Sequence, residues 1–416
     1  LLILTFLLAG LVALAVFGGW RTSLIVVLGV FTMVYFADLL FSFLLVVRSF
    51  RAPQEIAVSE EEIAAANAAV RWPTYSILCP LYKEWKVVRQ FAQAIARLDY
   101  PMRNIEVLLL LEEDDQQTLA AVRSLRLPAR FRVIVVPHSL PKTKPKALNY
   151  GLHHARGEYA VVYDAEDVPD PLQLKKAVIA FRKTDPRVVC MQAKLNFYNM
   201  RQNILTRVFT AEYALWFNLI LPGLQSLNAP LPLGGTSNHF RTKDLWLLEG
   251  WDPFNVTEDC DLGIRLHKKG YHTAMFDSTT LEEANSRLQN WLRQRSRWIK
   301  GYLQTYLVHM RRAGEFRNTA WEPHVLIFQL VVGGKVASIL INPLMWVVTV
   351  SYFVFRPVVG PTIESLFPAS IFYMAIFSLV IGNFLYLYCY MIGCAKNEHW
   401  DIIGYVFLVP IYWLMM

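Results

Sequence analysis

Residues 161–171, VVYDAEDVPDP, run from three branched or aromatic apolar residues directly into three carboxylates, Asp164, Glu166 and Asp167. A short apolar run that stops at turn-forming residues is typical of a buried strand, so we expect one to end at Tyr163. In open α/β sheets, ligands bind just beyond the carboxyl ends of the strands. Carboxylate oxygens at that position suit Mg²⁺ or Mn²⁺, which would in turn hold phosphate groups. The alternative is a solvated acidic turn.

The surrounding sequence alternates between two kinds of stretch. Short apolar runs predict strands at residues 75–78, 105–111, 131–136, 159–163 and 188–191. Amphipathic stretches between them predict helices at residues 86–98, 118–125, 146–155 and 171–181. This alternation is typical of a doubly wound α/β domain, whose mostly parallel sheet carries helices on both faces. A one-sided apolar pattern predicts a further helix at residues 204–220, either on the membrane surface, which we favour, or against the domain.

Long uncharged stretches indicate a membrane protein. The chain has 416 residues, 55% of them hydrophobic, and a mean hydropathy of +0.31, which is too apolar for an ordinary soluble protein. Because about 20 apolar residues cross a bilayer, we predict transmembrane helices at residues 1–20, 22–47, 336–355 and 370–393, and one cut short at 402–416. Asp38 interrupts the second span, either as the partner of a neighbouring helix or as a wall of a polar path. Since both ends are apolar, we expect a truncated chain.

Charge and composition divide the chain into segments. We predict a transmembrane helical hairpin, a linker, an α/β domain, interfacial helices and C-terminal transmembrane helices, at residues 1–50, 51–71, 72–300, 301–335 and 336–416. Arg48, Arg51, Arg311 and Arg312 flank the spans, and basic flanks face the cytoplasm. We therefore expect a multi-pass protein whose α/β domain is cytoplasmic. The net charge of +8 fits an anionic membrane surface and a phosphate pocket, so we expect no nucleic-acid partner.

Polar residues also follow the first two predicted strands. Tyr82 and Glu84 come after the first strand, and EEDD, residues 112–115, comes after the second. Carboxylates beside an aromatic ring can accept hydrogen bonds from uracil or ribose while the ring stacks on the base; a solvated turn is the alternative. The sequence contains neither GxGxxG nor GxxxxGK[S/T], so a nucleotide would be held through carboxylates, a metal and cations instead of a glycine-rich loop.

Two charged motifs stand at predicted helix starts. Lys142, Lys144 and Lys146 gain nothing from the dipole of the helix they open, so they fit a bound anion, or else a solvated basic loop. In TED, residues 257–259, the threonine can cap a helix and the two acids suit its first turn. The functional alternative makes one of these carboxylates a general base that deprotonates an attacking hydroxyl.

The stretch WLRQRSRWIKGY, residues 291–302, interleaves aromatic side chains with arginines and a lysine. Arg295 and Arg297 can grip a diphosphate bidentately, and the indole face of Trp298 suits the C–H face of a sugar ring. The alternative is a basic amphipathic helix on the membrane surface, and different faces of one helix can serve both roles.

In this order, the acid-ended strands, KPKALN (144–149), DAED (164–167), TED and QRSRW (294–298) resemble the processive family 2 glycosyltransferases, the group of bacterial cellulose, hyaluronan and chitin synthases. The resemblance covers about residues 75–302, and TED followed by QxxRW between membrane spans is its most specific part. It implies a GT-A fold, a UDP-sugar donor, Mg²⁺ or Mn²⁺, and a place in the bacterial inner membrane, with accessory secretion subunits as further partners.

The resemblance also implies a role for each matched residue. Uridine and the nucleotide would contact Tyr82, Glu84, Glu112, Asp114 and Lys146, and the diphosphate would contact Arg295 and Arg297. Asp164 and Gln294 would also belong to the donor site. The metal would bind Asp164 and Glu166, and the base would be Asp259, beside Glu258 and Thr257. The acceptor would contact Trp298 and, within a loop at residues 234–241, Gly235, Thr236, Ser237, Asn238 and His239; a plain turn at 234–241 is the alternative. Two departures remain open: D-A-E-D leaves Glu166 or Asp167 as the second metal ligand, and EEDD allows the uridine contacts to shift along the chain.

The expected activity is inverting, processive β-glycosyl transfer from a UDP-sugar, with UDP-glucose and a β-glucan favoured, and secretion of the chain through the transmembrane helices. One alternative is a non-processive transferase that adds one sugar to a membrane lipid. Another is a transporter or receptor whose cytoplasmic domain binds a nucleotide as a sensor.

Overall fold

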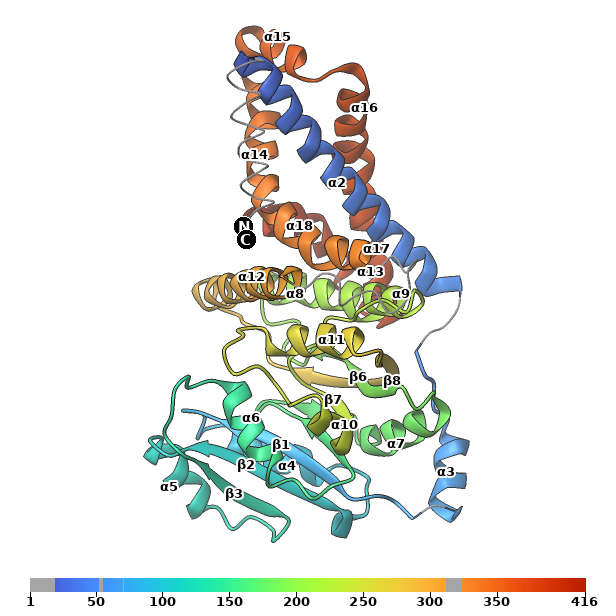
Figure 1. Cartoon of the computed structure of the whole chain (residues 1–416), viewed down its shortest axis with the longest axis vertical. Coiled ribbons are helices and arrows are strands. Elements are labelled where there is room, and N and C mark those ends of the chain that lie inside the picture. The colour runs from blue at the N-terminus through green and yellow to red at the C-terminus, as the bar shows by residue number, and fades with distance from the viewer. Residues whose placement is uncertain (1–18, 52–54, 70, 312–323) are drawn as a thin grey trace.

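Figure 1 shows the computed structural model of the chain, which describes residues 19–51, 55–69, 71–311 and 324–416. An α/β domain forms one end of the long axis, and a group of apolar helices forms the other. The first predicted span, residues 1–20, lies outside the described residues apart from Gly19 and Trp20, which begin α2 (Gly19–Arg51). Of the predicted hairpin, therefore, only the second helix is described.

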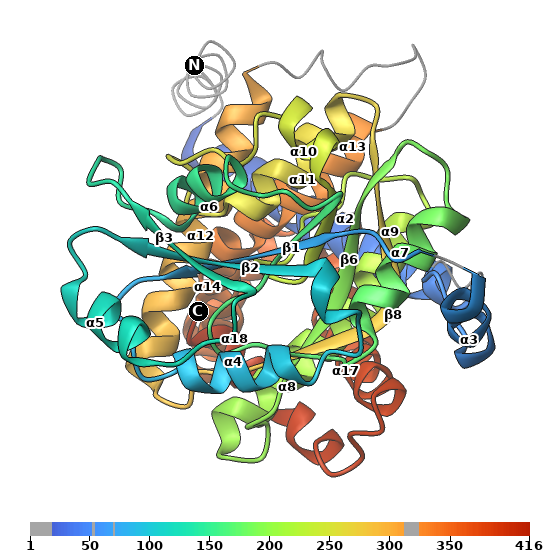
Figure 2. The ribbon, with the colours of Figure 1, turned by 90° about the horizontal axis from the view of Figure 1, so that it is seen from below.

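The α/β domain is built on an eight-stranded sheet with the strand order β3-β2-β1-β4-β7-β6-β8-β5. Its strands are β1 (Tyr75–Leu81), β2 (Ile105–Glu112), β3 (Phe131–Val136), β4 (Tyr159–Val162), β5 (Val168–Pro169), β6 (Val188–Phe197), β7 (Asn238–Arg241) and β8 (His272–Glu282). Strand β1 is parallel to β2 and β4, β2 to β3, and β6 to β8. The predicted mostly parallel sheet is confirmed, and Figure 2 shows it from below.

Helices cover both faces of this sheet. They are α4 (Val88–Ala96), α5 (Gln116–Ser124), α6 (Lys144–Leu152), α7 (Gln173–Lys183), α10 (Thr242–Leu247) and α11 (Glu258–Lys268). Leu109 of β2 belongs to the buried cluster on the side of α4, α5 and α7, whereas Leu108 and Leu110 belong to the cluster on the side of α6, α10 and α11. Burial on both faces explains why this strand is a continuous apolar run.

Strand β7 corrects one prediction. Residues 234–241 were expected to form an acceptor-binding loop, but Asn238–Arg241 form a strand that runs antiparallel to both β4 and β6. Its polar side chains do not mark a surface loop, because they find partners inside the sheet. The His239 Nδ1 atom lies 2.7 Å from the Tyr75 hydroxyl, and its Nε2 atom lies 3.2 Å from the Gln173 amide oxygen.

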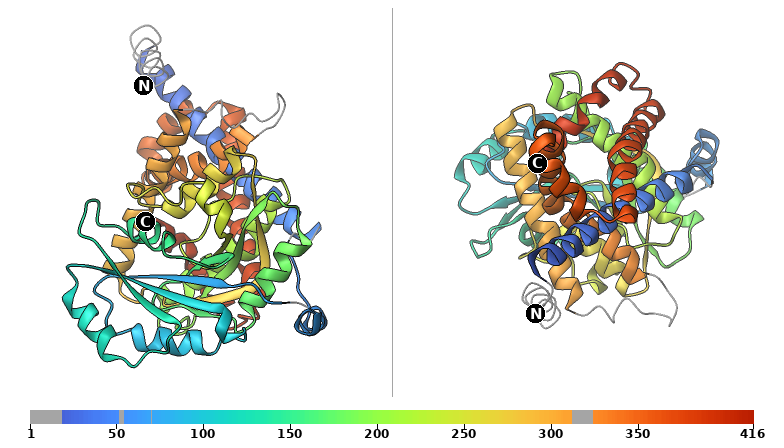
Figure 3. Two further views of the ribbon diagram at one scale, coloured as in Figure 1. Left: turned by 60° about the horizontal axis from the view of Figure 1, so that its bottom comes forward. Right: turned by 90° about the horizontal axis from the view of Figure 1, so that it is seen from above.

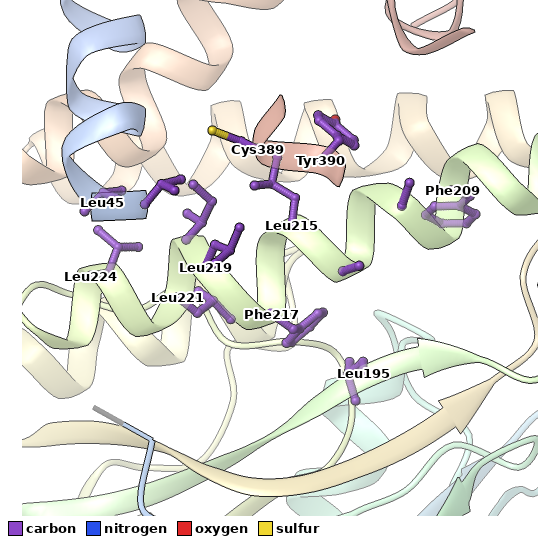
Figure 4. Packing of buried hydrophobic residues seen from close by; sticks show 14 of the residues in the cluster. Leu45, Leu195, Phe209, Leu215, Phe217, Leu219, Leu221, Leu224, Cys389 and Tyr390 are labelled. Carbon is purple, nitrogen blue, oxygen red and sulfur yellow. The ribbon is translucent and has the colours of Figure 1, made fainter. Parts of the chain in front are cut away.

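A layer of helices separates the sheet from the apolar helices. It contains α8 (Ile204–Leu215), a π-helical turn (Trp216–Ile220) and α9 (Leu221–Gln225). Figure 4 shows Phe217 directed toward Leu195 of the sheet, while Leu215 lies close to Cys389 of the apolar helices. The predicted helix is present and is packed between the sheet and the apolar helices. Its placement at a membrane surface stays a prediction.

Among the described residues, four helices are long and apolar enough to cross a membrane: Gly19–Arg51, Ile204–Gln225, His324–Val354 and Ala369–Lys396. The third comprises α13 (His324–Phe328), a π-helical turn (Gln329–Gly333) and α14 (Gly334–Val354); the fourth comprises α16 (Ala369–Phe377), a π-helical turn (Ser378–Gly382) and α17 (Asn383–Lys396). The predicted span at 402–416 contains the short apolar helix Ile403–Leu414, whose second part is α18 (Val409–Leu414). Seen from above in the right panel of Figure 3, α2 and the C-terminal helices lie together over the α/β domain.

The region predicted as interfacial helices is divided between two longer elements. Residues 301–310 belong to α12 (Leu288–Met310), which begins inside the predicted α/β domain. The apolar helix that follows starts at His324, earlier than the predicted residue 336. Residues 312–323 lie outside the described residues. The remaining helices are α3 (Glu60–Ala69) in the linker and α15 (Arg356–Leu366) between α14 and α16.

Candidate active site

One large cavity of about 1630 Å³ begins at the carboxyl ends of the central strands and continues between the apolar helices. Glu84 enters it after β1, Asp164 after β4, Asp259 at the start of α11 and Trp298 from α12. These residues are far apart in the sequence, yet they line the same cavity. The fold therefore brings together the strand-end acids, the TED motif and the QRSRW motif.

Carboxylates dominate the sheet end of the cavity. Glu84, Asp164, Glu166, Glu258, Asp259 and Glu282 all line it. Burial, reinforced by Glu166 and Asp164, raises the pKa of Glu84 to about 7. Burial also raises the pKa of Glu258 to about 7 and that of Asp259 to about 6. So many acids around one cavity create a demand for positive charge.

Lys144 provides part of that charge. Its ammonium nitrogen lies 2.5 Å from the Asp164 Oδ1 atom and 2.8 Å from the Gly235 carbonyl oxygen. Burial would lower its pKa, but Asp164 and Glu258 outweigh this effect and raise it. Lys144 therefore stays protonated at the centre of the acidic cluster.

The three acids of the DAED turn point in different directions. Asp164 and Glu166 line the cavity, whereas Asp167 is fully buried and accepts the Asp164 backbone N–H at 2.7 Å and the Thr236 hydroxyl. Within the described part of the chain, no three His, Cys, Asp or Glu side chains are grouped closely enough to hold a metal ion by themselves. Asp164 and Glu166 fit a Mg²⁺ or Mn²⁺ ion that takes its other ligands from water and a diphosphate, as Mg²⁺ commonly does.

The lysines that were expected to hold an anion are all paired with carboxylates in this structure. The Lys142 Nζ atom lies 2.6 Å from the Asp114 Oδ2 atom, and the Lys146 Nζ atom lies 2.8 Å from the Glu112 Oε2 atom. Of these residues, Lys142 and Glu112 line the cavity, whereas Asp114 and Lys146 are not among its described lining residues. Asp114 and Lys146, which were predicted to contact the donor, therefore do not line the cavity.

Tyr82 and Glu84 line the cavity. Tyr82 is 41% exposed, and the ammonium groups of Lys83 and Lys142 lie over its ring, 5.0 Å and 5.8 Å from the ring centroid. These two cation–π contacts place positive charge beside the ring, where it can face a phosphate.

The TED motif lies at the start of α11, where Thr257 occupies the N-cap position but its side chain makes no capping hydrogen bond. Its hydroxyl lies 3.3 Å from the Thr305 hydroxyl of α12, and its side chain occupies the space left by the missing side chain of Gly301. Thr257 therefore joins α11 to α12. The Asp259 carboxylate accepts the Cys260 backbone N–H at 2.7 Å and stands beside Gly235.

The two arginines of QRSRW lie in different environments. The Arg295 side chain is 8% exposed and forms a two-pronged ion pair with Glu212 of α8, with one Nη1–Oε1 distance of 2.9 Å. Its other guanidinium nitrogen, Nη2, donates to the Tyr412 hydroxyl at 2.5 Å. Arg297 is exposed, lines the cavity and has no ion-pair partner among the described residues. The predicted diphosphate contact therefore fits Arg297 and does not fit Arg295.

The remaining members of the motif also reach the cavity. Gln294 and Trp298 line it, and the Gln294 amide oxygen accepts a hydrogen bond from Asn285 at 3.0 Å. Gly235 lines the cavity as well. In contrast to the prediction, Thr236, Ser237, Asn238 and His239 do not reach it: each is at most 2% exposed, inside the sheet.

The sequence analysis did not identify several residues that line the cavity. Glu282 ends β8, Glu283 follows it, and Glu212 lies on α8. The signal for the first two was present, because TLEEAN repeats the pattern of an apolar strand that ends in acids. We missed it because β8 carries many polar residues and was not recognised as a strand.

The strand order, the helices on both faces and the acid-lined cavity define a GT-A domain. Residues 73–301 match the protein family described as "Glycosyltransferase like family 2", and the chain belongs to this family. A mannosyltransferase from Pyrobaculum calidifontis, solved with GDP-Man and Mn²⁺, has the same fold, with a TM-score of 0.60 and 18% identity over 91% of this chain and 99% of that one.

Curated relatives share the same region. The probable glycosyltransferase YdaM of Bacillus subtilis is 28% identical over 232 residues, 55% of each chain. The beta-monoglucosyldiacylglycerol synthase of Synechocystis sp. is 27% identical over 59% of this chain and 51% of its own length. Cellulose synthase 2 of Novacetimonas hansenii is 25% identical over 56% of this chain and 14% of its own length. The similarity thus spans about half the length of the first and second of these relatives and a smaller part of the third.

Proposed function

We propose that this family 2 glycosyltransferase is a membrane-embedded, inverting and processive enzyme that extends a β-linked polysaccharide from a UDP-sugar, with UDP-glucose as the favoured donor. The observation that carries the proposal is the continuity of the cavity. Its lining runs from Asp164 and Asp259 at the sheet to Asp38 on α2, Lys335 on α14 and Tyr386 on α17. An acceptor chain that starts at the acids would extend directly between the apolar helices.

The size and lining of the cavity favour a long acceptor. Pockets for one small ligand typically measure about 300–1,000 Å³, less than the 1630 Å³ found here. Aromatic side chains line its whole length: Tyr213, Trp216, Trp298, Tyr302, Tyr386, Tyr390 and Trp413. Their faces suit the C–H faces of successive sugar rings.

Asp259 is the proposed general base. A pKa of about 6 leaves its carboxylate ionised at neutral pH and close enough to neutrality to accept a proton efficiently. It would take the proton of the acceptor hydroxyl, whose oxygen then attacks the anomeric carbon of the sugar. The bond from that carbon to the phosphate oxygen breaks, UDP leaves, and attack from the opposite face turns an α-linked donor into a β-linked product.

The negative charge that develops on the leaving diphosphate needs nearby cations. Arg297 is exposed toward the cavity, and Lys144 lies beside Asp164, so both can offset this charge. A divalent cation held by Asp164 and Glu166 would add positive charge at the same place. The transfer centre is thus proposed to lie between the DAED turn, the TED motif and α12.

We place the protein in the bacterial inner membrane, with the α/β domain on the cytoplasmic side. The last turn of α2, next to that domain, carries Arg48 and Arg51, as expected for the cytoplasmic end of a span.

A second candidate function is the transfer of one sugar to a membrane lipid. The 27% identity to a beta-monoglucosyldiacylglycerol synthase supports this alternative, and the apolar helices around the cavity would accommodate acyl chains equally well.

Product size distinguishes the two candidates. The full chain in nanodiscs would be incubated with radiolabelled UDP-glucose and with other UDP-sugars, and the products would be separated by gel and by organic extraction. A long product that linkage-specific β-glycosidases degrade supports processive synthesis, whereas a single labelled glycolipid supports the alternative. Failure to release UDP from every nucleotide sugar tested would contradict both.

A further inference from the structure

Residues 234–237 end the connection from α9 to β7 and form a loop at the sheet end of the cavity. Gly234 and Gly235 line the cavity, whereas Thr236 is 1% exposed and Ser237 is fully buried. Thr236 was predicted to contact the acceptor, but its side chain does not reach the cavity. A buried polar side chain next to a candidate active site needs partners within the fold, and these partners indicate what Thr236 does.

Two fully buried side chains hold this loop. The Asp167 Oδ2 atom, in the DAED turn, accepts the Thr236 hydroxyl and also the Asp164 backbone N–H, the latter at 2.7 Å. From β6, the Gln192 side chain donates to the Thr236 carbonyl oxygen at 3.1 Å and accepts the Gly234 backbone N–H at 2.9 Å. Thr236 is therefore fixed through both its side chain and its backbone.

The backbone of Ser237 shows how tightly the loop is constrained. Its φ angle is +56°, in the left-handed region that residues with a side chain rarely adopt. Its N–H donates to the Val162 carbonyl oxygen at 2.8 Å, and its hydroxyl donates to the Thr280 hydroxyl at 2.7 Å. Such a conformation persists only where the surroundings fix it, and strained residues of this kind cluster at functional sites.

Gly235 connects the constrained loop to the proposed reacting groups. Its carbonyl oxygen accepts the Lys144 ammonium at 2.8 Å, and the same ammonium lies 2.5 Å from the Asp164 Oδ1 atom. A Cβ atom added at Gly235 would lie 3.5 Å from the Asp259 Oδ2 atom, which is ordinary van der Waals contact. The loop thus lies between Asp164, the proposed metal ligand, and Asp259, the proposed base.

Together these contacts form a closed circuit. Lys144 links Asp164 to Gly235, and the backbone continues from Gly235 to Thr236. The Thr236 hydroxyl then reaches Asp167, which returns the circuit to the Asp164 N–H. The other oxygen of Asp167, Oδ1, is buried and makes no hydrogen bond with the described residues, so it offers no substitute for the hydroxyl contact. Removing the Thr236 hydroxyl therefore opens the circuit.

We propose that Thr236 is a positioning residue of the transferase. Its hydroxyl fixes the 234–237 loop and thereby the distance between Asp164 and Asp259. Attack on the anomeric carbon requires the base, the acceptor oxygen and the leaving diphosphate in one arrangement, and a misplacement of about 1 Å can cost about 10²-fold in rate. This inference rests on the proposed function, which gives Asp164 and Asp259 their roles.

The test compares two substitutions of one side chain. Thr236→Val keeps its shape and removes the hydroxyl, whereas Thr236→Ser keeps the hydroxyl. Thr210→Val is the matched control, because Thr210 is also fully buried, its hydroxyl donates to the Thr206 carbonyl oxygen at 2.7 Å, and it does not line the cavity. Thr236→Ala, which leaves room for a water molecule beside Asp167, takes the place of Thr236→Val if that variant does not fold.

Two properties of the full chain in nanodiscs would be measured. The first is UDP release from UDP-glucose with acceptor present, as kcat and KM. The second is the affinity for Mn²⁺ in the presence of UDP, followed by electron paramagnetic resonance. Melting temperatures would be recorded for every variant, so that a loss of stability can be separated from a loss of position.

We expect Thr236→Val to lower kcat by about 10- to 100-fold and to change KM by less than about threefold, since a positional error affects the transition state more than substrate binding. Its Mn²⁺ affinity should fall by about tenfold, as is typical when a group that orients a metal ligand is removed. Thr236→Ser should restore both properties. Thr210→Val should change neither, even where its melting temperature falls as far as that of Thr236→Val.

Three results would overturn the proposal: equal kcat values for Thr236→Val and Thr210→Val, no recovery in Thr236→Ser, or a Mn²⁺ affinity of Thr236→Val equal to that of the wild type. A wild type that releases no UDP would contradict the proposed function instead. The Mn²⁺ affinities of the Thr236 variants would then decide the positioning role by themselves, and absence of Mn²⁺ binding to the wild type would count against it.

Discussion

Asp259 is the residue on which the proposed reaction depends most directly. Replacing it with asparagine keeps the shape of the side chain but removes the proton acceptor. We expect Asp259→Asn to lower sugar transfer by roughly 10²- to 10⁴-fold, while UDP still binds. The measurements are UDP release with acceptor present and UDP binding by calorimetry. Asp185→Asn, at an exposed acid on the domain surface, serves as control and should transfer normally; a similar rate in both variants would contradict the base assignment.

The same residue predicts a pH dependence. Burial raises the pKa of Asp259 to about 6, so the carboxylate is protonated below that pH and ionised above it. The rate of transfer should therefore rise as the pH increases through about 6 and then level off. A pH–rate profile of the wild type measures this, and a profile that falls over the same range would exclude an ionised Asp259 as the base.

Asp164 and Glu166 predict dependence on a divalent cation. We expect EDTA to abolish transfer and added Mg²⁺ or Mn²⁺ to restore it. Binding of Mn²⁺ in the presence of UDP, followed by electron paramagnetic resonance, should weaken in Glu166→Gln. It should stay unchanged in Asp185→Asn, and full activity in metal-free buffer would count against this pair of ligands.

Much of this site was predictable from single residues, because carboxylates that follow apolar strands meet at one edge of a parallel sheet. Arg295 and Arg297 of α12 show what was overlooked. Trp291, Arg295 and Trp298 recur at helical spacing on one stripe, and the structure buries the first two of them. Arg297 lies off that stripe and is exposed. The helical period would have separated the two arginines, but the sequence contains no local sign that Glu212 would meet Arg295.

At the scale of secondary-structure elements, the pair of Glu212 and Arg295 joins α8 to α12. The Arg295 side chain is 8% exposed and that of Glu212 is 24% exposed, so neutralising the acid leaves a largely buried positive charge. We expect Glu212→Gln to lower the free energy of unfolding by roughly 3 kcal/mol, seen as a lower melting temperature in nanodiscs.

An exposed ion pair provides the control for this prediction. The side chains of Arg187 and Asp185 are 66% and 51% exposed, so Asp185→Asn should cost less than about 1 kcal/mol. Equal melting temperatures for Glu212→Gln and Asp185→Asn would show that the buried pair does not hold the two helices together.

The central strands and their helices were predicted because their patterns are local. Strands β7 and β8 were not, for a physical reason. Polar residues such as His239 and Thr280 are acceptable inside this sheet because distant residues provide hydrogen-bond partners: Tyr75 for the first and Gln173 for the second. A pattern of apolar residues cannot reveal partners that the fold brings together later.

At the scale of the whole molecule, the contact between α9 and α2 fixes the domain against the apolar helices. A Cβ atom at Gly223 would collide with the backbone carbonyl of Leu45. Gly223→Ala should therefore push the two helices apart, lower the free energy of unfolding by about 1–3 kcal/mol and reduce transfer. Gly404→Ala is the control, since a Cβ atom there meets nothing within 4 Å; equal melting temperatures for both variants would contradict this role.

Helix α8 and the turn after it bury side chains on two opposite sides, Phe217 toward the sheet and Leu215 toward the apolar helices. A fragment trimmed to the GT-A domain alone would expose the second side to water. Such a truncated protein should precipitate or require detergent even though it lacks every flanking span, so efforts to express the enzyme for crystallisation should retain the helices that cover Leu215.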